Sequence, residues 1–206
     1  MLRNLIYYST SIVLFFGGMI VYGIILNIRE ETLYEAMQEK GITELNNVQL
    51  IVSRNNYTLD LYSDTTLVKT YKAVFGQGYG KIKTSKDDNI TPIGTYDICR
   101  IDTNNFFYKK IYINYPNKKD AAEAFKNGVI NKNEFALLMI DGSKCPASKT
   151  RLGANIGIQG IGEYNFIFKN LPFAFNWTNG SIAVSNENID EIISVLSDKT
   201  RVEIRN

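Results

Sequence analysis

The sequence predicts a mainly β domain with a few helices, preceded by one N-terminal transmembrane helix. Three observations lead to this fold class: an uncharged apolar run near the N-terminus, apolar residues that alternate from residue 48 onward, and few segments with helical spacing. The chain has 206 residues, of which 45% are hydrophobic and 21% are charged. Beside the membrane segment, this length suits a single globular domain of about 160 to 170 residues.

The apolar run covers residues 5–28, which include no charged side chain. As a helix it would reach about 36 Å, enough to cross a hydrocarbon core of about 30 Å. Arg3 and the terminal amine precede the run, and Arg29, Glu30, Glu31 and Glu35 follow it. Because positive charge favours the cytoplasmic side, we expect residues 1–4 in the cytoplasm and the domain outside. A cleaved signal peptide is the alternative, although no small-x-small cleavage site is evident after the run.

Residues 29–47 are predicted to be a helical spacer between the membrane and the domain at residues 48–206. Within this spacer, Glu30 to Lys40 has charged residues on one face and Leu33, Ala36 and Met37 on the other. Such spacing is typical of an amphipathic helix, and Gly41 is placed to end it.

The domain shows the two-residue period of β-strands, separated by turn residues. We expect strands at residues 48–52, 57–62, 67–75, 94–101, 110–115, 155–159 and 200–204. Helices are expected at Lys118–Asn127, ended by Gly128, and at Glu187–Leu196, capped by Ser185 or Asn186. Residues 76–89 and 131–153 are expected to be loop or irregular, and Glu163–Asn170 to be an insertion. The aromatic cluster at Asn104–Tyr108 is expected to be core or a plug at a strand end, and a carbohydrate-stacking platform is the alternative.

The composition excludes several classes of function. The chain has no histidine, so it has neither a histidine general base nor a histidine metal ligand, and we expect no metal and no cofactor. A net charge of +2 without a run of basic residues gives no indication of nucleic-acid binding. Cys99, expected to be buried in a strand, and Cys145, expected in a loop, are predicted to be free thiols, and a disulfide between them is the alternative.

One polar turn could hold a nucleophile. Asn176–Asn186 reads NWTNGSIAVSN, in which Ser181 directly follows Gly180 and precedes a short apolar step. A tight backbone turn of this kind can expose a hydroxyl, and it can equally serve only to bend the chain.

This turn resembles the active-site signature of the L,D-transpeptidase (YkuD-type) catalytic domain, in the branch that reads Asp-Trp-Thr-x-Gly-Cys-Ile-Ala-Val-x-Asn. Ile156–Gly160 (IGIQG) is similar to the strand that carries the Ile-His-Gly of that family. Further similarity lies in residues 51–62, in Thr91–Tyr96 (TPIGTY) and in Ile113–Asn117 (INYPN), so that the resemblance covers about residues 48 to 206. It implies the β-sandwich or barrel fold of that family and a site that acts on the peptide stems of peptidoglycan.

The resemblance also assigns site residues. Ser181 stands at the position of the nucleophilic cysteine, Gln159 at that of the histidine and Asn176 at that of an aspartate, while Gly160 and Gly180 keep the pattern. Trp177, Thr178, Asn179 and Asn186 are the expected substrate-binding residues. A serine hydroxyl is a poorer nucleophile than a thiolate, and an amide is no base, so the cysteine chemistry of the family is lost.

These residues lead to three hypotheses. The first is a membrane-anchored, extracytoplasmic protein that is catalytically degenerate and binds peptidoglycan stems or a cell-wall protein. The second is an active acyltransferase that uses Ser181, with Lys149 or Lys169 as an amine base or Glu163 as a carboxylate base. The third is a structural domain whose groove no longer has a ligand. We favour the first because the frame of the turn is intact around two replaced reactive groups.

Overall fold

The computed structural model describes residues 2–27, 30–80, 82–146, 150–171 and 173–206. In this part of the chain an eight-stranded mixed sheet has the order β3-β2-β1-β8-β4-β5-β6-β7. The strands are β1 Gln49–Ser53, β2 Thr58–Ser63, β3 Thr66–Lys72, β4 Gly94–Asn105, β5 Tyr108–Ile113, β6 Gly157–Gln159, β7 Ile182–Ala183 and β8 Arg201–Arg205. The helices are α1 Leu2–Asn27, α2 Leu33–Glu39, α3 Lys118–Lys126, α4 Lys132–Ile140, α5 Asn165–Lys169 and α6 Asn186–Ser194, with a 3₁₀ turn, η1, at Gly162–Tyr164.

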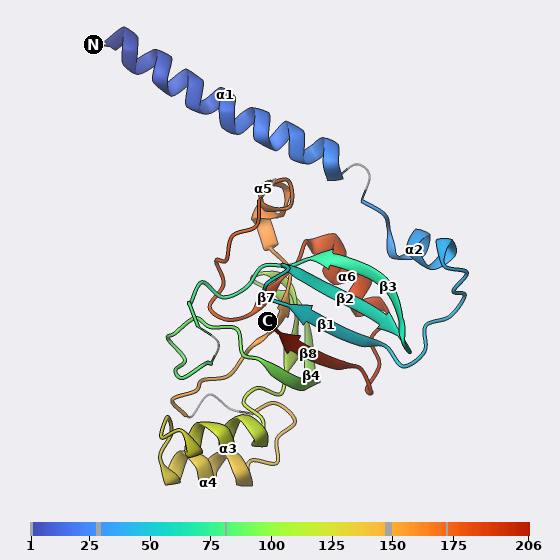
Figure 1. Cartoon of the computed structure of the whole chain (residues 1–206), viewed down its shortest axis with the longest axis vertical. Helices are drawn as coiled ribbons and strands as arrows, with labels where there is room; N and C mark the ends of the chain where they lie inside the picture. Colours follow the sequence, from blue (N-terminus) through green and yellow to red (C-terminus); the bar gives the residue numbers. More distant parts are fainter. Residues whose placement is uncertain (1, 28–29, 81, 147–149, 172) are drawn as a thin grey trace.

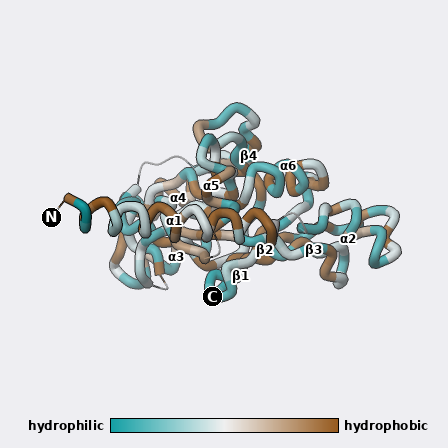
Figure 2. Tube along the Cα trace, turned by 90° about the horizontal axis from the view of Figure 1, so that it is seen from above, coloured by the Kyte–Doolittle hydropathy of each residue, from teal (hydrophilic) through white to brown (hydrophobic). Residues whose placement is uncertain are grey.

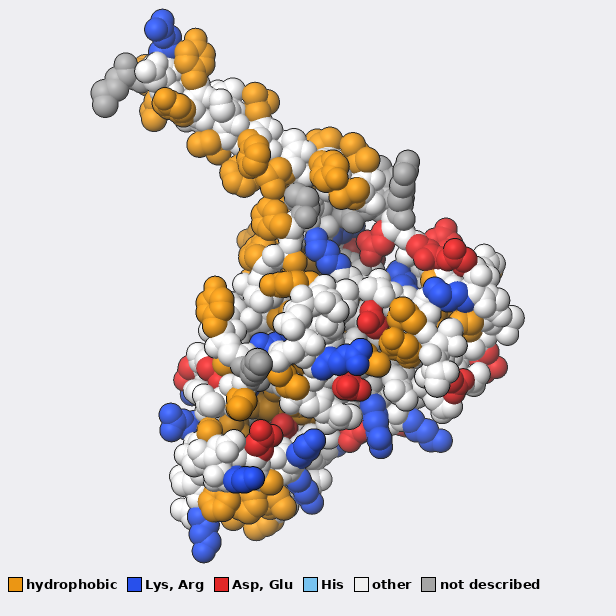
Figure 3. All heavy atoms as spheres, viewed as in Figure 1, with side chains coloured by type: hydrophobic (Ala, Val, Ile, Leu, Met, Phe, Trp, Pro, Cys, Tyr) orange, Lys and Arg blue, Asp and Glu red, His pale blue; other side chains and the backbone are white. Residues whose placement is uncertain are grey.

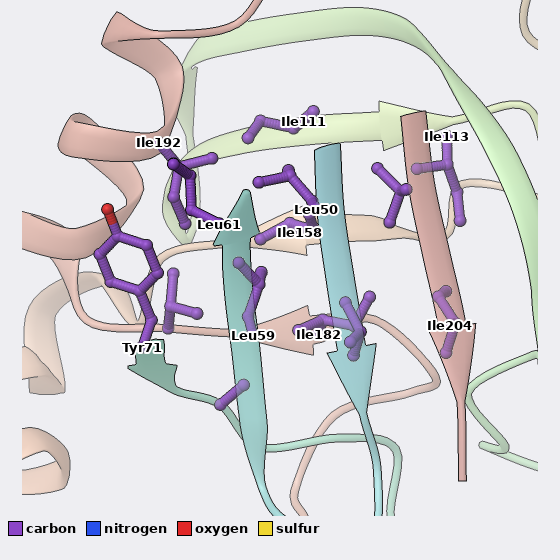
Figure 4. Close-up of a cluster of buried hydrophobic side chains, with 14 of the residues drawn as sticks. Leu50, Leu59, Leu61, Tyr71, Ile111, Ile113, Ile158, Ile182, Ile192 and Ile204 are labelled. Carbon is purple, nitrogen blue, oxygen red and sulfur yellow. The ribbon is translucent and has the colours of Figure 1, made fainter. Parts of the chain in front are cut away.

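The sheet folds over on itself, and β4 links its two halves. The start of β4, Gly94–Asp97, pairs with β8, whereas Ile98–Asn105 pairs with β5 after a shift in register. Strands β1, β2 and β8 therefore cross over strands β5, β6 and β7, with the core between the two layers (Figure 4). Leu50, Leu59 and Leu61 enter this core from one layer, and Ile111, Ile158 and Ile182 from the other. The predicted fold class, mainly β with a few helices, is confirmed.

Helix α1 extends away from the domain (Figure 1). Hydrophobic residues recur along it (Figure 2), and their side chains are visible on its surface (Figure 3). Among the described residues, it is the helix long and apolar enough to cross a membrane, over Leu2–Leu26. Only 6% of the most apolar stretch of this helix is buried, whereas the core helix of a soluble domain is mostly buried. Its last turns contact α5, where a Cβ on Gly23 would lie 1.6 Å from the carbonyl oxygen of Asn170.

Most of the predicted elements are found, with changed ends. The spacer helix is shorter than expected: Thr32 caps α2 and forms a capping box with Glu35. The Lys118–Asn127 helix is confirmed as α3, and Ser185 is the residue that caps α6. Residues 163–170 form the end of η1 and α5.

The expectation that residues 131–153 are irregular is wrong, because α4 occupies Lys132–Ile140. The side chain of Asn131 accepts hydrogen bonds from the N–H groups of Asn133 and Glu134, and the carboxylate of Glu134 accepts one from the N–H of Asn131. This capping box starts a helix that buries Leu138 with Ala121 and Ala124 of α3. The signal, Asn-x-x-Glu before an apolar run, was present in the sequence.

The expectation of two free thiols is also wrong. Cys99 in β4 and Cys145 in the loop after α4 form a disulfide across 46 residues of sequence. Cys99 is half-buried and not fully buried as expected. The bond fixes the segment that follows α4 to β4.

We expect removal of this disulfide to lower the stability of the domain. Closing a loop of 46 residues reduces the entropy of the unfolded chain, which corresponds to about 4 kcal/mol. A Cys99→Ser, Cys145→Ser double variant should therefore unfold at a lower urea concentration than the wild type. Dithiothreitol should lower the midpoint of the wild type and leave that of the double variant unchanged. Equal midpoints for the oxidised and reduced wild type would contradict this account.

Candidate functional site

Three neighbouring strands place the candidate site on the face of the sheet opposite the core. Ile111 of β5, Ile158 of β6 and Ile182 of β7 pair in register and point into the core (Figure 4). Because side chains alternate along a strand, the neighbours of these isoleucines point to the other face. Lys110 and Gln159 are partners in the same ladder, and Ser181 directly precedes β7. The register thus gathers Lys110, Gln159 and Ser181 on one face.

The turn that carries Ser181 is held by Thr178. The Thr178 hydroxyl donates to the carbonyl oxygen of Ser181, and the N–H of Gly180 donates to Thr178 Oγ1 at 3.2 Å. Gly180 has a φ of +107°, and a Cβ there would lie 2.8 Å from the carbonyl oxygen of Ile90. This conformation and this close approach both require glycine. Asn176 supports the segment by accepting a hydrogen bond from the N–H of Phe75 at 2.8 Å.

A lysine that the sequence hypotheses did not include lies beside Ser181. Lys110 Nζ donates a hydrogen bond to Ser181 Oγ at 3.0 Å, and both residues are buried, with 8% and 6% of their surfaces exposed. The alternation of β5 could have indicated which way Lys110 points. Its proximity to Ser181 follows only from the pairing of β5 with β6 and of β6 with β7.

The surroundings of Lys110 disfavour its charged form. Burial, followed by the nearby charge of Arg100, lowers the pKa of Lys110 to about 8. The ring of Tyr112 lies 5.1 Å from Lys110 Nζ and gives a weak cation–π contact. Among the residues that the structure describes, no carboxylate forms an ion pair with Lys110. A lysine in this setting is a base that can lose its proton near neutral pH.

Gln159 lies between the strands of Lys110 and Ser181. It is 2% exposed, and its side-chain amide has no hydrogen-bond partner within the described part of the chain. The next residue, Gly160, packs closely against two neighbouring groups. A Cβ on it would lie 2.7 Å from the carbonyl oxygen of Phe107 and 2.8 Å from Asn186 Oδ1. The backbone can therefore pass between these groups only without a side chain.

The four residues expected to bind substrate occupy different settings. Asn179 is exposed at the tip of the turn, whereas Thr178 is buried within it. Asn186 Oδ1 accepts hydrogen bonds from the N–H groups of Ile161 and Gly162 at 3.0 Å each, so its side chain joins the start of α6 to the segment after β6. Trp177 packs between Phe107 and Phe168.

The ring of Trp177 lines an apolar cavity of about 110 Å³ between β7, the start of α6 and the segment around α5. Its indole Nε1 is buried there and has no partner among the described residues. Ser181 and Gln159 are not among the residues that line this cavity, which include Val74, Phe168, Phe173, Phe175 and Val184. The aromatic cavity is thus adjacent to the candidate site, and the Ser181 hydroxyl does not line it.

The bases considered from the sequence alone are not found beside Ser181. Lys169 pairs with Glu187 of α6, and Glu163 lies in η1. Lys149 lies outside the described residues. Cys145 is in the disulfide, and the described residues include no group of three histidine, cysteine, aspartate or glutamate side chains that could hold a metal ion.

Comparison with known families identifies this domain. The sequence model of YkuD, described as the L,D-transpeptidase catalytic domain, matches residues 47–204. The chain belongs to the YkuD family. No match was found among curated proteins.

Several solved structures resemble the chain at low identity. Bd1075 from Bdellovibrio bacteriovorus is 17% identical, with a TM-score of 0.48 over 78% of this chain and 48% of that protein. The L,D-transpeptidase from Xylanimonas cellulosilytica is 11% identical, with a TM-score of 0.45 over 85% of this chain and 70% of the other. The helical cell shape determining protein Pgp2 from Campylobacter jejuni is 15% identical, with a TM-score of 0.47 over 85% and 55%. The chain thus spans about half the length of Bd1075 and Pgp2.

We expect Thr178→Val to destabilise the domain by about 1 to 3 kcal/mol. The valine leaves the N–H of Gly180 and the carbonyl of Ser181 without their buried partner. Urea unfolding, followed by the fluorescence of the single tryptophan, Trp177, measures the change. Thr178→Ser keeps the hydroxyl and should lose less stability, so equal losses in both variants would contradict the role of the hydrogen bonds.

The stability of the wild type relative to Lys110→Met should rise between about pH 8 and pH 10. The folded state lowers the pKa of Lys110 to about 8, whereas the unfolded chain keeps it near 10.4. Between these values the unfolded chain binds more protons, so stability increases with pH, and methionine does not titrate. Urea midpoints at several pH values test this. Lys109→Met is the control: Lys109 pairs with Asp190, which raises its pKa, so its effect should not change over the same window.

Proposed function

We propose that this chain is a membrane-anchored YkuD protein that faces the cell wall and binds the peptide stems of peptidoglycan. In this proposal residues 5–28 are the anchor, residues 29–47 the spacer, and the domain from residue 48 lies outside the cytoplasmic membrane. Helix α1 supports anchoring by its length and exposure, and the Cys99–Cys145 disulfide suits an oxidising compartment. Relatives that carry the name L,D-transpeptidase make a cell-wall substrate the natural choice.

One observation carries the binding proposal. The amide of Gln159 is in a 2% exposed residue beside Ser181 and has no partner among the described residues. The amide is not among the side-chain atoms that are fully buried without a partner, so it borders solvent and is open to a ligand that supplies donors and acceptors. A peptide stem has many such groups. Trp177, which lines the neighbouring aromatic cavity, has a buried indole Nε1 without a partner among the described residues, a second donor available to a ligand.

In this proposal Ser181 and Gln159 stand at the positions of the cysteine and the histidine of the family. The site is therefore degenerate with respect to thiol chemistry, and binding without thiol chemistry is the first candidate function. A second candidate, acyl transfer by Ser181, is favoured by a specific observation, the position of Lys110 Nζ 3.0 Å from Ser181 Oγ. Both candidates share the same binding step.

We expect a synthetic tetrapeptide stem that ends in a D-amino acid to raise the melting temperature of the full chain in detergent micelles. Ligand present at 100 times its Kd stabilises the folded state by about 2.7 kcal/mol. Differential scanning calorimetry measures the shift. Gln159→Leu should reduce it, whereas Lys109→Gln, outside the site, should not. No shift with any stem, together with no retention on purified cell walls, would overturn the proposal.

A Ser181→Cys, Gln159→His double variant provides an independent readout of the same groove. If the groove holds a stem in the orientation of the family, restoring both reactive groups should yield trimmed or cross-linked stems, which mass spectrometry detects. The Ser181→Cys single variant is the matched control, because it lacks the restored histidine.

A further inference from the structure

We propose that Ser181 and Lys110 form a serine–lysine dyad in which Ser181 Oγ is the acyl-accepting nucleophile and Lys110 Nζ its general base. The substrate class is the peptide amide at the end of a stem, so the inference rests on the stem binding proposed above. The dyad differs from the pairs considered from the sequence, because its base comes from β5 and not from the segments that carry Lys149 and Lys169.

The geometry meets the first requirement for proton transfer. Lys110 Nζ and Ser181 Oγ are 3.0 Å apart, within the range of about 2.6 to 3.2 Å over which a base can take a proton directly. In its ammonium form Lys110 donates to the serine. After losing a proton, the same amine accepts the hydrogen bond of the hydroxyl over the same distance.

The surroundings of Lys110 favour the amine over the ammonium form. A purely structural lysine would be expected to pair with a carboxylate or to reach solvent, because burying an unpaired charge is costly. Here β4 contributes the cation Arg100, β5 the ring of Tyr112, and β6 the uncharged Gln159. Asp102 of β4 is the cross-strand partner of Lys110, but its carboxylate accepts hydrogen bonds from the N–H of Asn104 and from Asn105 Nδ2. It forms no ion pair with the amine among the described residues, which leaves the weak contact with Tyr112 to favour the ammonium form. Consistent with this setting, burial lowers the pKa of Lys110 to about 8.

The backbone supplies an electrophilic partner. The N–H of Gly180 is engaged by Thr178 Oγ1, whereas the N–H of Ser181 has no acceptor among the described residues. It is therefore available to a substrate carbonyl as negative charge develops on the oxygen. Gln159 supplies a second donor group on the same face of the sheet.

The reaction balances without any further cofactor. Ser181 Oγ attacks the carbonyl carbon of the stem while its proton moves to Lys110 Nζ. The carbon–nitrogen bond then breaks, and the ammonium of Lys110 returns the proton to the departing amine of the terminal residue. This leaves an ester on Ser181. Water, or the amine of a second stem, attacks that ester, gives its proton to Lys110 and releases Ser181, which recovers its own proton.

A serine-directed fluorophosphonate tests the dyad without requiring stem binding. Ser181 Oγ would form the bond to phosphorus, fluoride would leave, and Lys110 would take the proton. With the full chain in detergent micelles, intact-mass spectrometry should show one adduct, located at Ser181 and absent from Ser181→Ala. The labelling rate should rise with pH to a plateau, with a midpoint near pH 8.

Lys110→Arg is the decisive variant, because arginine keeps the positive charge and donor groups but does not become a base. General-base catalysis typically contributes about 100-fold or more, so labelling should fall by at least that factor and lose the midpoint near pH 8. Lys109→Arg is the matched control and should label like the wild type. The melting temperature of each variant reports whether it is folded, and the pH profile of the wild type is independent of any variant. The dyad would be overturned if Lys110→Arg were labelled at the wild-type rate, or if the adduct still formed in Ser181→Ala.

Incubation with the tetrapeptide stem separates the two proposals. A stem that loses its terminal residue, or an acyl adduct on Ser181, supports both. A stem-induced rise in melting temperature without labelling or conversion overturns the dyad and leaves stem binding in place. Labelling of Ser181 without any effect of the stem supports the dyad and overturns its assignment to stem peptides.

Discussion

The alternation of side chains across β5, β6 and β7 is the constraint on which the site depends. Ile111, Ile158 and Ile182 pair across these strands and are buried in the core. Their neighbours in the chain, Lys110 and Gln159, must therefore point to the other face. A slip of one residue in β5 would place Lys110 among isoleucines and Ile111 beside Ser181, so the apolar pairing strongly favours the observed register. The core of the domain thereby sets the positions of the reactive groups.

The consecutive lysines of β5 show how much the setting of a side chain matters. Lys109 pairs with Asp190 of α6 at 2.7 Å, and this contact raises its pKa. Lys110, one residue later, points to the opposite face, and burial together with Arg100 lowers its pKa. The same residue type is thus an ordinary surface cation at one position and a potential base at the next.

Much of the fold could be predicted from the sequence because its signals are local. The alternation of β1 and β2, the capping residue Ser185 and the uncharged run within α1 each depend on neighbours in the chain. Helix α4 had a local signal too, the Asn131 capping box, although the irregular composition around it was given more weight. The Cys99–Cys145 disulfide and the contact of Lys110 with Ser181, 71 residues apart, depend on tertiary structure and have no local signature. The candidate bases Lys149 and Lys169 were therefore considered without any sequence signal that placed them beside Ser181.

In the proposed site, a hydroxyl in place of a thiol also changes which base is suitable. A thiol ionises near neutral pH, so a histidine with a pKa near 6.5 can carry its proton. A serine hydroxyl is far less acidic and needs a stronger base, yet an ordinary lysine with a pKa near 10.4 is almost wholly protonated at neutral pH. Burial beside Arg100 gives Lys110 a pKa of about 8, between those of imidazole and of an ordinary lysine. At pH 7 roughly a tenth of the amine is then unprotonated, and it remains a stronger base than imidazole. Gln159 is on β6, the strand between those of the two groups, and its amide does not titrate, so it does not compete for the proton. Serine, amide and buried lysine therefore form a consistent set, in which each residue makes chemical sense in the presence of the other two.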